Sequence, residues 1–386
     1  MRFTAKVVVF LLGLCALLNI YSTQPLLPAL ARDLNVPLNL TTWTISATTL
    51  GVAVMAPFAG SVSDYLGRKR VMVAAIVATS VVTLACAAAW NFEALMVFRF
   101  AQGLLIPFVF AVAVTYLAEE YSGSTVIAAN ALYISGTAFG GFCGRFLSGA
   151  VTTAFGWRSS FILLGLVLLL VLISTVAWLP RESNFQRSTS LLASLRGIGQ
   201  HFRNWRLLAT CLIGASILFL QVGAFTYSGL YLETFGLGVF EIGAVFAVFL
   251  VAVVVTPITS RLISRIGRLK TFAAANVVSL AGLAVTMIPA VPAVITGLAG
   301  SSTGVFSAQS CATGYAAESG KAARSSAVGL YLTSYYAGGS IGAIVPAPFY
   351  AAGGWPACAG LLAGVTVVSM VIAVLAWSKK SKESHA

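Results

Sequence analysis

The sequence predicts an all-α membrane protein that crosses the bilayer twelve times, in two similar halves of six helices. Three observations support this fold class. Hydrophobic residues make up 59% of the 386 residues and charged residues only 9%, too few to coat a water-facing surface. The apolar residues occur in blocks of about 20 to 27, the length that crosses a hydrocarbon core of about 30 Å. The two halves of the chain also repeat each other.

Twelve apolar blocks alternate with short polar connections, and each is predicted to be one spanning helix because a helix satisfies its own backbone polar groups inside lipid. The predicted limits are 6–31, 42–62, 71–90, 95–117, 127–154, 158–179, 207–232, 241–262, 270–289, 292–316, 325–350 and 355–378. We therefore expect one six-helix bundle over 1–180 and a second over 207–386. Between them, the basic segment 181–206 is expected to be a cytoplasmic linker with an amphipathic helix on the membrane surface.

The basic residues predict how the helices are oriented in the membrane. If the N-terminus is cytoplasmic, nineteen of the 23 Lys and Arg residues fall in cytoplasmic segments and two in outer loops, while Arg99 and Arg145 lie within spans. Basic loops stay on the cytoplasmic side. We therefore expect a multi-pass protein of the inner (plasma) membrane with both termini in the cytoplasm. The net charge of +13 has the same origin and does not indicate nucleic-acid binding.

An internal duplication relates the two halves. At an offset of 198 residues, the string ALYISGTAFGGFCG that begins at Ala131 aligns with GLYLTSYYAGGSIG that begins at Gly329. Further matches are Trp157 with Trp355, Glu120 with Glu318 and, at an offset of 200, Gly67–Arg68 with Gly267–Arg268. Parallel six-helix repeats of this kind occur in membrane transporters.

The loop between the second and third predicted spans carries the most specific motif, GSVSDYLGRKR, from Gly60 to Arg70. Gly60 is expected to let two helices approach closely, and Gly67 to permit the tight turn that joins two spans. Asp64 can accept hydrogen bonds at a helix end, and Arg68 offers a planar set of donors to a carboxylate on a neighbouring helix. The fixed Gly, Asp, Gly and Arg spacing indicates more than a basic anchor.

With this motif the sequence resembles the major facilitator superfamily along its full length. RFAQG, which begins at Arg99, is similar to the family's fourth-helix pattern, and QPLLPAL, which begins at Gln24, to the first-helix pattern of its twelve-span drug/proton antiporters. The run GTAFGGFCGR matches the fifth-helix antiporter signature only in part, with Arg145 where that signature has Gly. The runs YLAEE and SSAVGLYLTSYYAGGSIG resemble a bacterial inner-membrane group in which an Arg at this place belongs to the pattern.

The resemblance implies the major facilitator fold and proton-coupled efflux of a small organic solute by alternating access, without an enzymatic activity, a metal or a cofactor. Ion-coupled uptake of an organic acid or a sugar stays open as an alternative. A membrane-embedded enzyme or a sensor is a remote one, because no catalytic grouping stands out and the last residues, from 379 to 386, offer no output domain.

Two charges lie inside predicted spans, Arg99 in the fourth and Arg145 in the fifth, and no Asp or Glu lies in mid-membrane. A charge at the bilayer centre costs about 2.5 to 3.5 kcal/mol on insertion scales, so each arginine is expected to face a cavity or a partner. Arginines without a buried acid favour a neutral or anionic solute over a lipophilic cation. Asp33, at the outer end of the first span, is the expected proton carrier, with its pKa lowered by either arginine when close.

Polar and aromatic residues of the central helices are predicted to line the substrate cavity together with the two arginines. They are Asn19, Tyr21, Gln24, Gln102, Asn130, Tyr133, Gln221, Tyr227, Gln309, Tyr331 and Tyr335. A conformational latch at the cytoplasmic face, which holds one state of two rocking bundles, is predicted from Gly60, Asp64, Gly67, Arg68, Glu119 and Glu120, with a thinner copy from Arg265, Arg268 and Glu318. We expect a monomer whose partners are a small organic solute, protons and the lipid bilayer.

Overall fold

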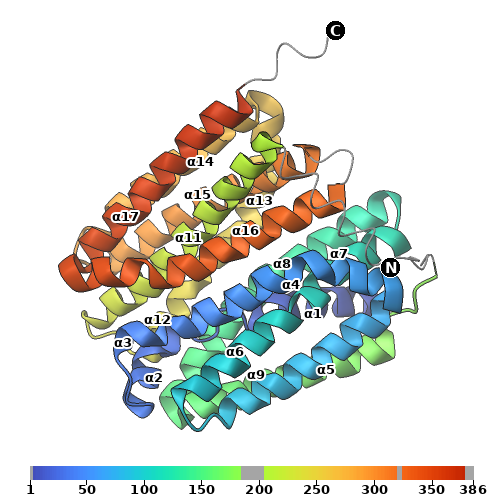
Figure 1. Ribbon diagram of the computed structural model, residues 1–386, viewed down its shortest axis with the longest axis horizontal. Helices are drawn as coiled ribbons and strands as arrows, with labels where there is room; N and C mark the ends of the chain where they lie inside the picture. The colour runs from blue at the N-terminus through green and yellow to red at the C-terminus, as the bar shows by residue number, and fades with distance from the viewer. Residues whose placement is uncertain (1–2, 184–203, 320–323, 379–386) are drawn as a thin grey trace. The chain divides into compact units, whose positions relative to one another are not determined.

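The structure is a computed structural model that describes residues 3–183, 204–319 and 324–378, and every regular element in these ranges is a helix (Figure 1). The first helices are α1 (Phe3–Leu18), η1 (Gln24–Leu26), α2 (Leu27–Asp33), α3 (Leu38–Thr41), α4 (Trp43–Leu66), α5 (Arg68–Ala87), α6 (Phe92–Leu105), α7 (Pro107–Glu120), α8 (Gly123–Phe155) and α9 (Trp157–Trp178). They are followed by α11 (Trp205–Glu233), α12 (Val239–Val245), η2 (Phe246–Leu250), α13 (Val251–Ile266), α14 (Arg268–Val285), α15 (Val291–Ser319), α16 (Arg324–Ile344) and α17 (Pro346–Trp377). The amphipathic helix predicted in the linker falls outside the described residues.

Contacts divide the chain into two compact units. The first comprises residues 1–192 and 236–250, with α1 to α9, α12 and η2. The second comprises 193–235 and 251–386, with α11 and α13 to α17. The sequence assigns 236–250 to the second half, yet α12 and η2 pack against α8 of the first unit. The domain limits drawn from the sequence stay predictions.

In the described ranges, nine helices are long and apolar enough to cross a membrane, and α1 is a shorter apolar helix. Several predicted spans are broken. The first contains a break after α1, before Pro25 and Pro28, and the fourth is interrupted before Pro107, because proline cannot continue the helical hydrogen bonds. In α17, Gly353 and Gly354 leave the helical conformation and separate the last two predicted spans.

The duplicated glycines bring pairs of helices into close contact. In the first unit α8 runs along α1 (Figure 1), and a Cβ added at Gly140 would lie 2.2 Å from the carbonyl oxygen of Leu14. In the second unit α16 packs along α11, and a Cβ at Gly338 would lie 2.0 Å from the carbonyl oxygen of Ala215. Side chains larger than hydrogen cannot fit there. The repeat in the sequence is therefore a repeated helix-packing surface.

The first unit buries its apolar core among α1, α5, α7, α8 and α9, where Leu12, Tyr116 and Leu164 are at most 1% exposed. Large apolar side chains elsewhere face outward, with Val97 of α6 and Leu170 of α9 each 64% exposed. A chain that is apolar on its outside as well as in its core is suited to lipid.

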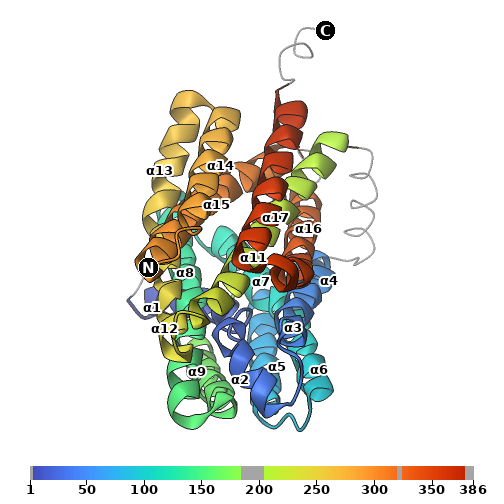
Figure 2. The same ribbon diagram turned by 90° about the vertical axis from the view of Figure 1, so that its left-hand side faces the viewer.

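The second unit uses the same small-residue packing. Its helices α14 and α15 lie side by side (Figure 2), and a Cβ at Gly304 would lie 2.3 Å from the carbonyl oxygen of Ala275. At the other end of the unit, the rings of Trp377 and Tyr315 stack at 4.9 Å.

Candidate functional site

The helix α8 carries Arg145 into the interior of the first unit, where α12 approaches α8 at two glycines. A Cβ at Gly149 would lie 2.6 Å from the carbonyl oxygen of Val239, and one at Gly243 would lie 3.1 Å from that of Arg145. This approach places η2, which follows α12 directly, against the Arg145 side chain.

Three aromatic rings enclose the guanidinium of Arg145. Its central carbon lies 4.6 Å from the ring centroid of Tyr21, 4.8 Å from that of Phe246 and 4.7 Å from that of Phe249. These distances fall within the range of cation–π attraction, which strengthens when the cation is removed from water. Tyr21 follows α1, whereas both phenylalanines belong to η2, about a hundred residues beyond Arg145 in the chain.

Neutral oxygens complete the surroundings of Arg145. Its Nε donates to Oε1 of Gln24 at 2.6 Å, and one Nη donates to the carbonyl oxygen of Gly141. The residue is 5% exposed, and among the described residues no ion pair joins it to an acid. A guanidinium has five N–H donors, so three are left without a protein acceptor in the described structure.

Arg99 of α6 is wholly buried and is held by backbone carbonyls. Its nitrogens donate to the carbonyl oxygens of Asn19 at 2.9 Å, Ile20 at 2.8 Å and Thr44 at 3.2 Å. The side-chain oxygen of Gln102 accepts a fourth bond at 2.7 Å. Because α1 ends at Leu18, the contacts to Asn19 and Ile20 supply donors where the helical hydrogen bonds stop.

Thr83 of α5 joins the polar groups around Arg99, and the sequence analysis did not find it. Its Oγ accepts from Nδ2 of Asn19 at 3.2 Å and from Nε2 of Gln102 at 2.8 Å, and donates to the carbonyl oxygen of Thr79 at 2.6 Å. A threonine in a helix commonly bonds to the carbonyl four residues earlier. Nothing in the sequence therefore distinguished Thr83 from the many other threonines.

The other residues predicted for the cavity are spread over both units. Tyr133 and Tyr227 each donate to a backbone carbonyl of another helix, at 3.2 and 2.7 Å, and the buried ring of Tyr331 stacks on Tyr335 at 6.0 Å. Three more are partly exposed, without a side-chain hydrogen bond to another described residue: Asn130, Gln221 and Gln309. The structure thus groups Tyr21, Gln24 and Arg145, and separately Asn19, Arg99 and Gln102.

Asp33, at the end of α2, pairs with residues at the start of α9. Its Oδ2 accepts from Nε1 of Trp157 at 2.8 Å and lies 2.5 Å from a nitrogen of Arg158. The hydrogen bond from Trp157, followed by that from Arg158, holds the pKa of Asp33 below its ordinary value of 3.8. The expected partners were Arg99 or Arg145, but the fold brings Arg158 of α9 to Asp33 instead.

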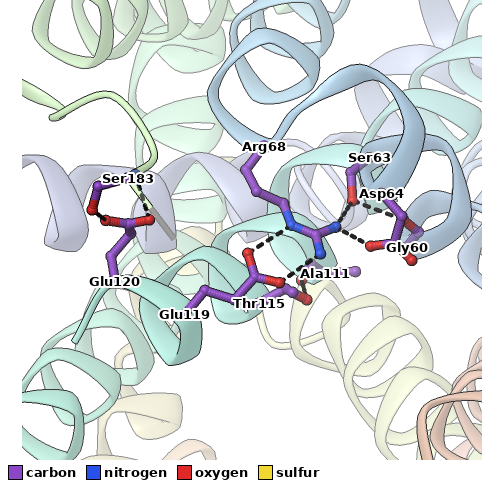
Figure 3. Close-up of polar contacts among 9 residues, drawn as sticks. All are labelled: Gly60, Ser63, Asp64, Arg68, Ala111, Thr115, Glu119, Glu120 and Ser183. Atoms are coloured by element: carbon purple, nitrogen blue, oxygen red, sulfur yellow. Dashed lines mark hydrogen bonds and ion pairs between the residues drawn. The ribbon is translucent and has the colours of Figure 1, made fainter. Parts of the chain in front are cut away.

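At the junction of α4 and α5, Arg68 binds two carboxylates (Figure 3). Its Nε and Nη2 donate to the two oxygens of Glu119 at 3.0 and 2.7 Å, and Nη1 lies 2.5 Å from Oδ1 of Asp64. The hydroxyl of Ser63 also accepts from Nη1. The guanidinium side chain is only 5% exposed, so this bidentate pairing compensates a nearly buried charge.

Three other residues of the predicted latch have distinct surroundings. Glu120 accepts from the backbone N–H and the hydroxyl of Ser183 at 2.8 and 2.6 Å, apart from the Arg68 group (Figure 3). A Cβ at Gly60 would meet no described atom within 4 Å, so the close helix approach expected there is not found. Gly67 has a φ of 99°, which glycine adopts readily and which the tight turn requires.

The corresponding loop of the second unit has a simpler arrangement. The two Nη groups of Arg268 donate to the two oxygens of Glu318 at 2.7 and 2.6 Å. The place of Asp64 is taken by Ser264, at the offset of 200, so no second carboxylate is available there. Arg265 is exposed on α13 and forms no ion pair with a described residue.

A search of the described residues finds no cluster of three or more His, Cys, Asp or Glu side chains that could hold a metal ion.

The sequence of this chain is similar to those of known proteins. The model of the Major Facilitator Superfamily matches residues 9–343 and, in a second alignment, 245–386. The inner membrane transport protein YnfM of Escherichia coli is 32% identical over 98% of this chain and 90% of its own length. An uncharacterized transporter of Buchnera aphidicola subsp. Schizaphis graminum is 28% identical over 86% of this chain and 81% of its own.

Two further similarities are more limited. The first covers a shorter segment, and the second concerns the fold alone. The 4-hydroxybenzoate transporter PcaK of Acinetobacter baylyi is 30% identical over 41% of this chain and 35% of its own length. The crystal structure of the human organic anion transporter MFSD10 superposes with a TM-score of 0.74 at 18% identity, over 96% of this chain and 98% of that chain.

Proposed function

The chain belongs to the major facilitator superfamily, and on that premise we propose that it exports a small anionic or neutral organic solute in exchange for protons, by alternating access. As a member, it is a multi-pass membrane transporter of small solutes and not an enzyme. The observation that carries the substrate class is the environment of Arg145.

Arg145 is suited to bind an anionic group. It is buried without a carboxylate among the described residues, and three of its N–H donors have no protein acceptor there. Hydrogen bonds to a charged donor are about twice as strong as neutral ones. The rings of Phe246 and Phe249 stabilise this cation only in part. An anion at this site would accept the hydrogen bonds that water accepts from an exposed guanidinium.

The rings around Arg145 favour a solute that carries an aromatic or other flat apolar group. Such a group can stack beside Tyr21 while its acidic group meets the guanidinium. PcaK, which matches part of this chain, is named a 4-hydroxybenzoate transporter. An aromatic carboxylate combines both features, so this class of compound is the first to test.

Proton coupling is assigned in this proposal to Asp33. In the described conformation the bonds from Trp157 and Arg158 keep its carboxylate ionised. A conformation that separates Asp33 from these donors and also removes it from water would raise its pKa above the ordinary value and let it take up a proton. The alternation between the two conformations would then tie protonation to transport.

We assign the conformational latch to the two arginine clusters at the loops before α5 and α14. Arg68 with Glu119 and Asp64 forms the stronger one, and Arg268 with Glu318 the weaker one. In this proposal both loops face the cytoplasm, as do the two termini, in line with the distribution of basic residues.

The substrate proposal is tested by counterflow in proteoliposomes. The probes are radiolabelled 4-hydroxybenzoate and other aromatic carboxylates, with tetraphenylphosphonium as the lipophilic cation. Arg145→Gln should lower carboxylate transport by about tenfold or more, because a charge-assisted bond contributes about 1.5 to 3 kcal/mol, and Arg145→Lys should retain part of it. The matched control is Arg32→Gln, an exposed arginine of the same unit, which should have no effect.

Two outcomes contradict the proposal. One is carboxylate counterflow that Arg145→Gln leaves unchanged. The other is saturable transport of the cation in preference to every anion tested. The direction is read separately from cells, because an exporter depletes the solute and an uptake carrier accumulates it. Uptake of an organic acid is the second candidate, because the name of PcaK gives 4-hydroxybenzoate, an organic acid, as its solute and does not give a direction.

A further inference from the structure

A basic cavity of about 690 Å³ lies beside the Arg68 cluster, where α4 meets α5 and α9 ends. Among the described residues, three cations line it, Lys69, Arg70 and Arg181, together with one acid, Glu182. Arg70 and Arg181 are exposed, and neither forms an ion pair with a described residue. The cavity therefore has a net charge of about +2 from its side chains.

The carboxylate of Glu182 already accepts a hydrogen bond from the protein backbone. The N–H of Lys69 donates to Oε2 of Glu182 at 3.4 Å, and the other oxygen of Glu182 lies directly over Gly67, where an added Cβ would be 2.8 Å away. The Nζ of Lys69 in turn donates to the carbonyl oxygen of Val176 at 3.1 Å and to that of Leu179. These bonds fix the end of α9 over the start of α5 and leave Arg70 and Arg181 for a ligand.

An apolar groove of about 450 Å³ begins at the same place. It shares Leu66 and Arg70 with the basic cavity, and it continues along α5 between α4 and the region where α6 passes into α7. Its other walls are apolar and include Ala74, Ala78 and Phe108. The alanines of α5 leave the space that a larger side chain would fill. Arg70 therefore stands where a charged site meets an apolar one.

We propose that this composite site binds one anionic phospholipid, with the phosphate of the headgroup at Arg70 and Arg181 and one acyl chain in the groove. Basic pockets between spanning helices suit acidic headgroups. Charge complementarity selects an anionic over a zwitterionic lipid. The apolar groove selects a lipid over a free phosphate, which would occupy the basic cavity alone.

The test measures lipid binding to the full-length protein, purified in detergent and stripped of lipid, by native mass spectrometry. The probes are phosphatidylglycerol and phosphatidylcholine with identical acyl chains, and glycerol phosphate as the chain-free anion. Phosphatidylglycerol should bind with the higher affinity. The variant Arg70→Gln/Arg181→Gln should weaken its binding by about fivefold for each cation removed.

Two further variants separate the parts of the site. Arg261→Gln/Lys270→Gln removes the same charge from exposed residues of the second unit and should leave binding unchanged. Ala78→Trp fills the groove without changing charge, and it should weaken phosphatidylglycerol binding but not glycerol phosphate binding. Size-exclusion chromatography reports whether each variant is folded.

Three results overturn the proposal. They are equal affinity for the two lipids, an equal loss in the Arg261 and Lys270 control, and phosphatidylglycerol binding that Ala78→Trp leaves intact. Because no transported solute enters the measurement, its outcome is independent of the substrate proposed for Arg145.

Discussion

Arg99 and Arg145 are both buried in the first unit without an acid among the described residues, yet they are held in different ways. Arg99 donates to three backbone carbonyls and to Gln102, which uses at least four of its five donors. Arg145 has aromatic rings on its faces and uses two donors. The difference shows that burial alone does not distinguish an arginine whose donors are satisfied by the protein from one whose donors are left for a ligand. The number of donors already satisfied does.

The largest expected effect is on stability, and it separates the two arginines directly. Arg99→Met should destabilise the protein by about 3 kcal/mol, because the carbonyls of Asn19, Ile20 and Thr44 each lose a donor worth about 1 kcal/mol. Arg145→Met should cost about 1 kcal/mol, because its rings stay packed. Thermal unfolding in detergent measures both. Equal losses in the two variants would remove the distinction.

The second largest expected effect is on solute affinity, and it comes from the aromatic rings around Arg145. Phe249→Leu removes one π face and should weaken solute affinity by at least about tenfold, since a cation–π contact away from water contributes about 2 kcal/mol. Phe240→Leu is the matched control, because that ring packs on Phe146 at 5.6 Å and not on the guanidinium. Solute-induced thermal shifts report both affinities. If the two substitutions act alike, the rings serve packing alone.

The same contrast between well-paired and sparsely paired arginines extends to the two loop clusters. Glu119→Gln removes one of the two carboxylates that pair with the nearly buried Arg68 and should lower the transport rate several-fold. Glu318→Gln breaks a pair whose carboxylate is 49% exposed and should cost under about 1 kcal/mol, with a smaller effect on rate. Initial rates in proteoliposomes decide the order. A larger effect from Glu318→Gln would reverse the proposed assignment of strong and weak latches.

The smallest effect concerns Asp33, whose pair with Arg158 is half exposed and so contributes under about 1 kcal/mol. Because the pKa of Asp33 in the folded protein is lowered, its stabilisation is present above the unfolded value and is lost as the pH falls through the folded value. The stability difference between the protein and Asp33→Asn should therefore be constant near neutrality and shrink below about pH 4. A difference that stays the same at every pH would show that the pair is open in solution, because the pKa of Asp33 would then be equal in the folded and unfolded protein.

The sequence analysis predicted the fold class and the repeat correctly, because both depend on patterns that extend over whole helices. It was less successful within helices. Breaks in front of prolines interrupt the predicted spans at 19–23, before Pro107 and before Pro346. Glu318 aligns with Glu120 in the duplicated sequence. In the structure, Glu318 pairs with Arg268, and the residue that pairs with Arg68 in the same way is Glu119. One residue along a helix turns a side chain by about 100°, so an alignment shifted by one selects the wrong face.

The candidate site was predicted in part. Polar residues in apolar helices are conspicuous, so Tyr21, Gln24 and Arg145 were named for one cavity together with Asn19, Arg99 and Gln102, without the separation into two groups. That these residues line a substrate cavity stays a prediction. Phe246, Phe249 and Thr83 were not predicted, because phenylalanines and threonines are common in such helices and carry no signal of their own. Trp157 was recognised as a repeated residue, but not as the partner of Asp33.

The sequence by itself determined that this chain is a helical membrane protein, that its halves are related, and that its interior holds two arginines without an acid. These properties depend on the composition, on the spacing of apolar residues and on the repeated strings. All three can be read along the chain without knowing which segments meet in space. Only the tertiary structure decided which arginine is saturated by carbonyls and which is enclosed by rings. The difference between the two arginines depends on the break after α1 and on the approach of α12 to α8. At both places, segments far apart in the chain meet within a few ångströms.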